Sequence, residues 1–371
     1  MNIARVCSFF PPVEGGLEIL VYEETKELVK LGNKVTVFTS DALREGRIAK
    51  KEEIVNKVKV YRLPTWCRFS YFTLVFPGVW WKALTASYDV MHVSSYRQPH
   101  NLCILIAKLR GKKAILAMHW PEYPKELRSS WINKIIPVFD KTLGKWIVKA
   151  ADKIIVHTQA EKEWVMKKFG RKKAIEVVPG GISKDYLKRR YPLAFRKKYQ
   201  IKGSMVLYVG RIHKSKGVHK IVEIASKFPE TTFVIVGDGP ERKDLENVIK
   251  AKKIKNIKMI GRVSEEEKIQ AYAACDVFLH PAEFECFGIT LVEAMAQGKP
   301  TLGSNVGGIP SVVGSPLLTF NKDDMIDLEK KLRNLLENKK LREEIGKQAR
   351  KKAEAMTWDK IAQQLNRVYH T

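Results

Sequence analysis

The sequence predicts an α/β protein built from two successive doubly wound parallel sheets. Short apolar runs that are typical of strands alternate with segments of helical periodicity along the whole chain, which indicates parallel sheets covered by helices. The length of 371 residues is too great for one ordinary core and suits two domains. An apolar share of 45% with 29% charged residues is typical of a globular chain rather than a disordered one.

The first half of the chain begins with a strand predicted at 3–10, followed by a turn at 11–16. Apolar residues then recur at helical spacing as far as Leu31, and Gly32 ends that helix. Four further strands are expected to end in polar residues, at 33–40, 89–95, 113–120 and 152–158. We assign residues 1–182 to a first domain, which the C-terminal helix 358–371 is expected to join.

The second half repeats the scheme, and we assign residues 183–357 to a second domain. Strands are expected at 204–210, 231–239, 256–263, 276–282 and 300–305. Helical patterns lie between or after them at 241–253, 265–275, 289–297 and within 323–371. In such sheets ligands bind beyond the carboxyl ends of the strands. We therefore look for function in the loops that follow each predicted strand.

The cysteines and the apolar runs bear on disulfides, metal binding and location in the cell. The five cysteines are scattered and form no CxxC, so we expect buried or free thiols rather than disulfides or a zinc site. Cys286 fits a small residue in a tight turn better than a reactive thiol. No run of 18 uncharged apolar residues occurs, and the first residues resemble a strand rather than a signal peptide. A cytoplasmic location is the expectation.

The net charge of +27 is large and is spread over both halves, with +14 in residues 1–182 and +13 in the remainder. The stretch 184–198 concentrates seven basic residues and one acid. Three interpretations remain: a Lys/Glu-rich surface of the thermophilic kind, attraction to an anionic membrane or lipid-phosphate substrate, or nucleic-acid binding. The last lacks any helix-turn-helix, zinc or RNP-like pattern. The aromatic segment 68–81 fits either a lipid contact or a buried strand–loop–helix.

Two loops carry anion-binding signals. In PPVEGG (11–16), Gly15 and Gly16 allow close backbone approach at a helix N-terminus, although an ordinary turn has the same pattern. In VGRIHKSKG (209–217), Arg211 and Lys216 follow a strand end and suit the oxygens of a diphosphate. This is not a Walker A loop, because GxxxxGK[ST] does not occur. VGDGPE (236–241) lacks the third glycine of a dinucleotide fingerprint, and we interpret it as a structural turn.

The stretch EFECFGITLVEAMAQGKP (283–300) contains three glutamates around a helix start. We expect Glu283 and Glu285 in the loop after a strand and Glu293 in the second turn of the following helix. The helix should start near Gly288 and stop at Gly298. Its first amides would suit an anion, and the carboxylates on either side would suit sugar diols. Glu283 is predicted to be an ordinary loop residue.

Together these motifs resemble the retaining GT-B glycosyltransferases of sequence family four, the Glu-x7-Glu or group 1 type. The run ECFGITLVEAMAQGKP (285–300) has the family's spacing of the two glutamates. Supporting motifs follow in the family's order: PPVEGG with GNKVTVFTS, YDVMHVSS, HW at His119, VVPGGI, VGRIHKSKG, VGDGPE, GRV (261–263) and NVGGIP (305–310). Two departures are Gly180, where the family commonly has Asn, and CFG in place of a more usual Pro-Phe-Gly; neither removes a charge.

The resemblance implies a fold, namely two Rossmann-like domains facing across a cleft, and a role for each matched position. Glu285 would hold hydroxyls of the donor sugar and Glu293 the ribose diol. Arg211 and Lys216 would neutralise the diphosphate, and Val263 would line the base pocket. His119, Arg211, Lys216 and Glu285 form the implied catalytic set. Backbone around the diphosphate would come from Gly15, Gly16, Phe287, Gly288, Ile289 and Thr290.

The implied reaction is retaining transfer of a hexose (mannose, glucose or N-acetylglucosamine) from a GDP- or UDP-linked donor to an acceptor hydroxyl. A lipid-linked or phosphorylated acceptor in glycolipid or glycan biosynthesis fits the basic charge, and it suggests a peripheral position at the inner face of the cell membrane. No Asp-x-Asp occurs, so we expect no metal and no cofactor. The alternatives are a GT-B-shaped sugar-nucleotide epimerase and, in a different class, a basic nucleic-acid-binding protein.

Overall fold

A computed structural model describes residues 1–13, 15–43, 45–70, 73–122, 124–188 and 190–371. Glu14 of the loop 11–16, Tyr71 and Phe72 of the aromatic segment, and Arg189 of the basic stretch lie outside these ranges. The chain forms two compact units. Unit 1 contains Met1–Gly180 and Trp358–Thr371, and unit 2 contains Gly181–Thr357.

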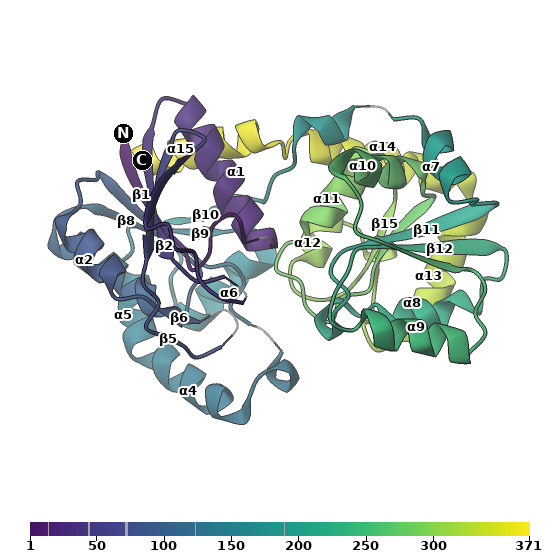
Figure 1. Ribbon diagram of the computed structural model, residues 1–371, viewed down its shortest axis with the longest axis horizontal. Coiled ribbons are helices and arrows are strands. Elements are labelled where there is room, and N and C mark those ends of the chain that lie inside the picture. The colour runs from purple at the N-terminus through teal and green to yellow at the C-terminus, as the bar shows by residue number, and fades with distance from the viewer. Residues whose placement is uncertain (14, 44, 71–72, 123, 189) are drawn as a thin grey trace. The chain divides into compact units, whose positions relative to one another are not determined.

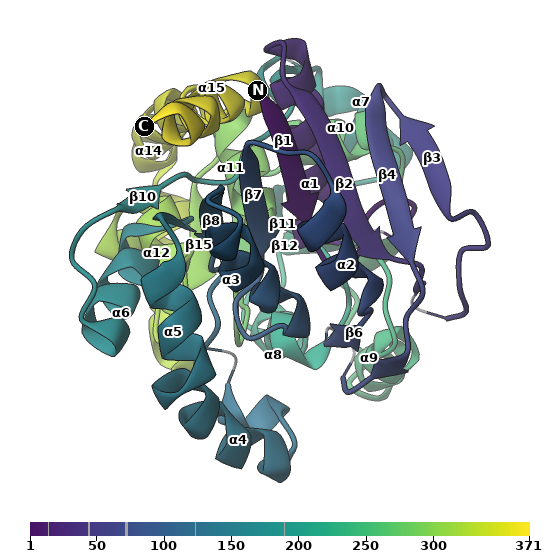
Figure 2. The same ribbon diagram turned by 90° about the vertical axis from the view of Figure 1, so that its left-hand side faces the viewer.

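The described part of unit 1 contains an eight-stranded sheet in the order β10-β9-β8-β7-β1-β2-β4-β3, and Figure 2 shows its central strands side by side. All neighbours pair in parallel except β3 and β4, which form an antiparallel edge. The strands are β1 (Asn2–Val6), β2 (Lys34–Ser40), β3 (Glu52–Val55), β4 (Val58–Leu63), β7 (Val90–Ser94), β8 (Lys113–Ala117), β9 (Lys153–Val156) and β10 (Ile175–Val177). The strand order reverses between β1 and β7, which is where ligands bind in such sheets.

Helices cover both faces of this sheet. They are α1 (Gly16–Lys30), α2 (Gly78–Thr85), α3 (Leu102–Leu109), α4 (Ser130–Lys141), α5 (Leu143–Ala150), α6 (Gln159–Phe169) and α15 (Trp358–His370). The C-terminal α15, yellow in Figure 1, packs against α1, because Leu365 and Tyr369 share a buried apolar cluster with Ile3 and Leu28. A small hairpin joins β5 (Cys67–Arg68) to β6 (Leu74–Val75).

The described part of unit 2 has a six-stranded, fully parallel sheet in the order β13-β12-β11-β14-β15-β16. Its strands are β11 (Ser204–Val209), β12 (Thr231–Val236), β13 (Ile257–Gly261), β14 (Val277–His280), β15 (Thr301–Ser304) and β16 (Thr319–Phe320). Its helices are α7 (Pro192–Lys198), α8 (His219–Ala225), α9 (Arg242–Ala251), α10 (Glu265–Ala274), α11 (Ile289–Ala296), α12 (Ile309–Val313), α13 (Met325–Glu337) and α14 (Lys339–Glu354). The order reverses between β11 and β14, so the loops after these two strands meet at one edge.

The predicted α/β class with two doubly wound parallel sheets is confirmed, although several strands are shorter than predicted. β1 ends at Val6, and the apolar residues that follow, such as Cys7 and Phe10, are buried in a loop. Burial rather than strand pairing explains why the residues from Cys7 to Phe10 are mostly apolar. The strands β3, β4, β10 and β16 were not predicted. Within the described ranges, no helix combines the length and the apolar character that a membrane crossing needs.

The basic stretch 184–198 is not an isolated positive segment, because acids of unit 2 pair with several of its members. Lys188 pairs with Asp185, and Lys198 pairs with Glu267 at the start of α10. Arg190 and Arg196 pair with Glu266 and Asp276 at 3.0 and 2.8 Å. Part of this local charge is therefore neutralised within the fold.

Candidate active site

The loops after β11 and β14 are locked together by backbone contacts. Gly217 has φ +62°, and a Cβ built on it would lie 1.9 Å from the carbonyl oxygen of Pro281. Only glycine fits both this conformation and this approach. The carbonyl of Ser215 also accepts the N–H groups of Glu283 and Phe284, over 2.9 and 3.2 Å. This packing fixes Lys216 of one loop beside Glu285 of the other.

Glu285 is the centre of a small charged cluster. Its Oε2 accepts hydrogen bonds from Lys216 Nζ at 2.7 Å and from His280 Nε2 at 2.9 Å. Burial raises the pKa of Glu285, whose side chain is only 14% exposed, but the Lys216 charge and the His280 hydrogen bond outweigh it. The net effect is a pKa well below the usual range, so Glu285 is a carboxylate at neutral pH.

His280 is held in place by its neighbours. It is the last residue of β14, and its ring stacks between Phe278 and Tyr208, with centroids 6.1 and 6.2 Å away. Tyr208 in turn donates its hydroxyl to the carbonyl of Arg211 at 2.9 Å. Since Nε2 must carry a proton to donate to Glu285, the histidine acts here as a fixed donor that orients the carboxylate.

Helix α11 begins directly beside Glu285. Gly288 precedes its first turn with φ +85°. In the described part of the chain, the amides of Gly288, Ile289 and Thr290 donate to no acceptor, whereas Leu291 donates to the Gly288 carbonyl. The backbone carbonyl of Glu285 also accepts a hydrogen bond from the N–H of Gly308 at 3.0 Å, which fixes the backbone at Glu285. The arrangement places open helix-end amides next to a lysine and a carboxylate, which suits a phosphate linked to a hydroxyl-rich group.

Glu293 is buried in the second turn of α11 and is already engaged by two partners. Its Oε2 accepts the hydroxyl of Tyr272 at 2.7 Å, and its Oε1 lies 3.4 Å from Lys268 Nζ. Burial, together with the neighbouring Glu293 carboxylate, raises the pKa of Tyr272 well above its usual value, so the phenol stays a donor. The predicted role of Glu293 toward a ribose stays a prediction.

Glu283 forms ion pairs with side chains outside its own loop. It forms an ion pair with the buried Lys220 of α8 and lies 3.6 Å from Lys322. These contacts tie the β14 loop to the rest of unit 2, so the residue has a structural role that the sequence prediction missed. Cys286, half-buried nearby, forms no disulfide with any of the other four cysteines.

The remaining predicted residues of unit 2 lie around the same edge of the sheet. Arg211 is exposed directly after β11, and Val263 is half-buried between β13 and α10. The VGDGPE loop packs tightly on the loop after β11: a Cβ on Gly239 would lie 2.1 Å from the carbonyl oxygen of Ile212. Its glycines are therefore explained by packing, in agreement with the predicted structural turn.

In unit 1, His119 follows β8 with φ +54° and stacks on His157, with ring centroids 4.5 Å apart. Its Nδ1 lies 2.7 Å from Nε2 of His157, whose Nδ1 donates to the carbonyl of Val178 at 2.8 Å. This chain of contacts assigns the Nδ1 proton to His119. Burial, together with the nearby His157 and Arg5, lowers the pKa of His119 well below its usual value, so the ring is neutral at pH 7.

The predicted glycine loop of unit 1 precedes α1. Gly15 is in an extended conformation, and its carbonyl accepts from Ile19 at 3.0 Å. A Cβ on Gly16 would meet nothing within 4 Å, so the packing of unit 1 does not require this glycine. That leaves close approach of a ligand as one reason for a glycine here.

Several contacting residues escaped the sequence prediction, among them His157, Tyr272 and His280. The two histidines close predicted strands and so carried a positional signal, since polar residues at strand ends face the binding edge. Tyr272 gave none, because an aromatic residue within an apolar helix pattern is usually a core residue.

A lysine–carboxylate pair lies at a helix end beyond the parallel sheet of unit 2, which is where α/β enzymes bind their ligands. The comparisons identify the family. Residues 14–186 match the model "Glycosyltransferase Family 4", and residues 194–352 match the model "Glycosyl transferases group 1". The chain belongs to the group 1 glycosyltransferases with the GT-B fold, and it is a hexosyltransferase.

Two of the similar proteins are glycosyltransferases by name. The chain is 26% identical over 360 residues to the phosphatidylinositol N-acetylglucosaminyltransferase GPI3 subunit of Saccharomyces cerevisiae, covering 92% of this chain and 76% of that protein. It is 26% identical to the glycosyltransferase MJ1069 of Methanocaldococcus jannaschii, covering 97% and 96%. Among solved structures, Anabaena HepE in complex with UDP matches 100% of both chains with 19% identity and a TM-score of 0.78. Sucrose-phosphate synthase from Thermosynechococcus elongatus matches with 21% identity and a TM-score of 0.77, covering 100% and 98%.

Proposed function

We propose that this protein is a retaining, metal-independent glycosyltransferase that moves a hexose from a nucleotide-diphosphate sugar to a hydroxyl of a lipid-linked or phosphorylated acceptor. The observation that carries the proposal is the cluster at the start of α11. There Lys216 and His280 hold Glu285 as a carboxylate beside open backbone amides. A positive side chain, a helix end and an acceptor of hydroxyl hydrogen bonds occur at one place, as a sugar diphosphate requires.

The donor would be held by different parts of the cluster. The diphosphate would lie on the α11 amides with Lys216 and Arg211 supplying positive charge. Oε1 of Glu285, which has no partner among the described residues, would accept hydroxyls of the hexose. Glu293 with Tyr272 would bind the ribose, and the loop at Val263 would contact the base. Gly15, Gly16 and His119 belong to unit 1, and their contacts with the donor stay a prediction from the family resemblance.

The lowered pKa of Glu285 argues against a role as general acid, because such an acid must be protonated near neutral pH. In the proposed reaction, the bond between the sugar C1 and the phosphate oxygen breaks and a bond from C1 to the acceptor oxygen forms on the same face. The acceptor proton passes to an oxygen of the leaving phosphate. Lys216 and Arg211 stabilise the charge that develops there, as pre-organised electrostatic catalysts. His119, neutral at pH 7, would contribute a hydrogen bond rather than a charge.

A lipid acceptor is supported by the relatives. The Saccharomyces protein is named for phosphatidylinositol, and the match covers 92% of this chain. The net charge of +27 would attract an anionic substrate or surface. We propose a peripheral membrane location on these grounds, with glucose, mannose and N-acetylglucosamine donors all to be tested.

The test is a transfer assay with UDP- and GDP-linked hexoses and membrane lipid extract, run in EDTA, with thermal shift measurements on each nucleotide. A bound donor should raise the melting temperature by mass action. We expect one nucleotide to stabilise the protein, sugar to appear in a lipid product, and an anomeric configuration equal to that of the donor. Conversion of the donor without an acceptor would indicate an epimerase instead. Binding to nucleic acid with a steep salt dependence and to no nucleotide sugar would overturn the proposal.

A further inference from the structure

Helix α4 exposes an apolar stripe that stays accessible among the described residues of unit 1. Trp131, Ile135 and Val138 recur at a spacing of four and three residues, which places them on one helix face. Their exposed fractions are 48%, 53% and 62%. Lys134 and Lys141 are exposed beside this stripe. Such a combination of large apolar and basic side chains is unusual on a surface that faces only water.

The opposite face of α4 holds the helix in place. Asp140 is the acid of this helix, and it is buried. It pairs with Arg97 at 2.7 Å and with Lys168 at 3.2 Å, and it accepts the hydroxyl of Tyr96 at 3.1 Å. The exposed stripe is therefore presented by an anchored helix, and its own negative charge points inward.

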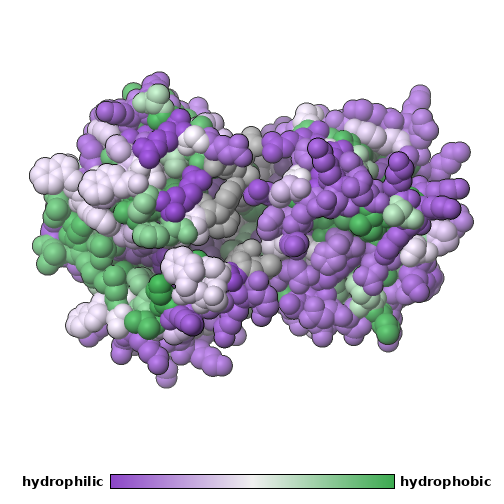
Figure 3. Space-filling view, turned by 60° about the horizontal axis from the view of Figure 1, so that its bottom comes forward, coloured by the Kyte–Doolittle hydropathy of each residue, from purple (hydrophilic) through white to green (hydrophobic). Residues whose placement is uncertain are grey.

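Helix α5 follows α4 after Thr142 and also carries exposed aromatic and basic side chains. Its Ile147 and Val148 are buried, whereas Lys145, Trp146 and Lys149 are exposed, with Trp146 at 66%. The ammonium of Lys149 lies 5.9 Å from the Trp146 ring centroid. Figure 3 shows green and white side chains gathered over unit 1, at its left.

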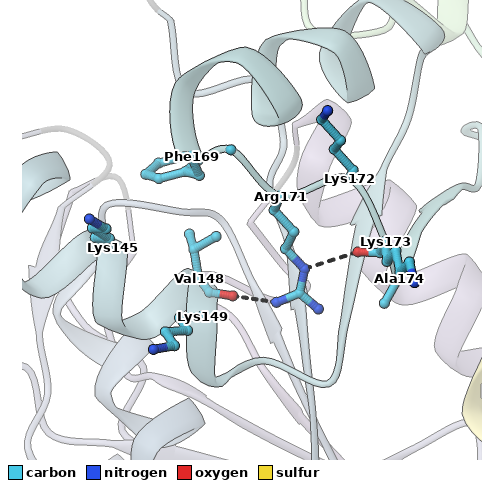
Figure 4. A pocket seen from close by; sticks show the side chains of 9 residues that line it. Lys145, Val148, Lys149, Phe169, Arg171, Lys172, Lys173 and Ala174 are labelled. Carbon is cyan, nitrogen blue, oxygen red and sulfur yellow. Dashed lines mark hydrogen bonds between the residues drawn. The ribbon is translucent and has the colours of Figure 1, made fainter.

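A basic cavity of about 570 Å³ adjoins α5. Figure 4 shows Lys145 and Lys149 on one side, and Arg171, Lys172 and Lys173 on the other. The remaining lining residues are apolar or small, and no acidic residue is among them: Val148, Phe169, Gly170 and Ala174. The cavity thus combines an apolar wall with five basic side chains.

The guanidinium of Arg171 has no carboxylate partner at hydrogen-bond distance in the described chain; backbone carbonyls hold it. It donates to the carbonyls of Val148 at 2.6 Å, Asp152 at 3.0 Å and Lys173 at 3.2 Å. Burial lowers the pKa of Arg171, although the residue remains a cation. Its charge is fixed in the wall of the cavity, where it adds to the field of the lysines.

We infer that the surface formed by α4, α5 and this cavity, the α4–α5 surface, docks on an anionic lipid bilayer. Trp131, Ile135, Val138 and Trp146 would enter the boundary between headgroups and acyl chains. The lysines would bind headgroups, and the cavity would take the phosphate of one anionic lipid. Charge complementarity favours this occupant over a second copy of the chain, since two such basic faces would repel each other. Aliphatic Ile135 and Val138 have no counterpart on a nucleic acid.

This surface differs from the segment 68–81, which the sequence suggested as a lipid contact. In that segment Leu74, Phe76 and Val79 are buried in the core of unit 1, while Phe69 and Trp81 are exposed. The segment therefore has both buried and exposed side chains, and Tyr71 and Phe72 lie outside the described residues. The inference about the α4–α5 surface is independent of the proposed transfer reaction, because docking needs neither donor nor acceptor.

Binding of the full-length protein to sedimenting vesicles, without nucleotide, tests the inference. We expect strong binding to phosphatidylcholine vesicles containing phosphatidylglycerol, and weak binding to phosphatidylcholine alone or in high salt. A Lys145→Glu/Lys149→Glu variant should bind at least tenfold more weakly, because each basic residue near an anionic surface raises the affinity about fivefold. The matched control is Lys347→Glu/Lys351→Glu, an exposed pair with the same spacing on α14, which should bind as the wild type does.

A Trp131→Ser/Ile135→Ser/Val138→Ser variant separates insertion from charge attraction. We expect it to lose binding even in low salt, while circular dichroism and the melting temperature show a folded protein. An equal loss of vesicle binding in the α14 control would overturn the inference. Wild-type binding by both α4–α5 variants would also overturn it, and so would a wild-type protein that does not bind the vesicles. A concentration-dependent dimer that both variants abolish, or duplex RNA that displaces the vesicles from the same residues, would also contradict it.

Discussion

The substitution Glu285→Gln tests whether this carboxylate recognises the donor sugar. Oε2 of Glu285 accepts two charge-assisted hydrogen bonds, from Lys216 at 2.7 Å and His280 at 2.9 Å. Such bonds contribute about 1.5–3 kcal/mol each, whereas neutral ones contribute about 1 kcal/mol. Glutamine keeps the shape and one acceptor oxygen, so we expect a loss of about 1–4 kcal/mol in the free energy of unfolding.

The expected effect on catalysis is larger than the effect on stability. Removing one pre-organised polar contact to a transition state typically costs about 2.7–4 kcal/mol, which corresponds to a loss of about 10²–10³ in rate. Binding of a nucleoside diphosphate should not weaken, because this ligand lacks the sugar that Glu285 is proposed to hold. The assay is transfer from the donor identified above, alongside calorimetric binding of the corresponding nucleoside diphosphate.

Glu283→Gln is the matched control, because it makes the same chemical change two residues earlier in the same loop. Glu283 pairs with the buried Lys220 rather than with Lys216, so its loss should reduce stability to a similar extent. We expect its transfer rate to stay close to the wild-type rate at a temperature where both variants are folded. A Glu285→Gln enzyme with nearly full activity, or an equal loss in Glu283→Gln, would refute the reasoning.

The pH dependence of stability provides an independent readout of Glu285. Its folded-state pKa lies below the unfolded value, so its contribution to stability is complete above the ordinary glutamate range and is lost as the pH falls below it. The difference in melting temperature between wild type and Glu285→Gln should therefore be constant between about pH 6 and 8 and should narrow below about pH 5. A difference that widens toward low pH would contradict the sign of this shift.

Three further predictions concern backbone packing, buried histidine and metal. Gly217→Ala should unfold or inactivate the protein, because the new Cβ would lie 1.9 Å from the Pro281 carbonyl oxygen. Gly170→Ala is the control: it has a similar φ of +66° but faces open space, so it should lower the free energy of unfolding by only about 1 kcal/mol. Thermal melts of the two variants distinguish these outcomes. Burial lowers the pKa of His100 to about 4, so stability should fall by up to about 3 kcal/mol as the pH drops from 6.5 to 4. His100→Gln, which keeps a donor for the Ser94 carbonyl, should show a smaller fall in melts across this range. EDTA should leave the transfer rate unchanged, and recovery of a lost rate by added Mg²⁺ or Mn²⁺ would show the opposite.

The periodicity of apolar residues was enough to predict the α/β class. The rule that ligands bind beyond the carboxyl ends of parallel strands was enough to choose the loops of the candidate site. The runs at 204–210 and 276–282 form the neighbouring strands β11 and β14, and the loops after them carry Lys216 and Glu285. A parallel sheet brings such loops to one edge whichever side chains they carry. Sequence spacing within each loop was therefore sufficient to place the candidate residues.

The pairing of these residues could not be predicted, because it depends on how two loops pack. The contact of Lys216 with Glu285 follows from the close approach of Gly217 to Pro281, a tertiary feature that local spacing does not encode. The role of Glu283 was missed for the same reason, since its partner Lys220 comes from another helix. The exposed stripe of α4 shows the same limit, because helical periodicity predicts an apolar face but not whether the core covers it.

The charge state of Glu285 links the packing of unit 2 to the proposed chemistry. A carboxylate buried alone would take up a proton and could serve as an acid, as in many glycosidases. Here Lys216 and His280 remove that option by lowering its pKa. The ammonium of Lys216 has three N–H groups, and its charge lies at the carboxylate of Glu285. In the proposed transfer, the acceptor proton therefore passes to the leaving phosphate, which is a base that the donor itself brings.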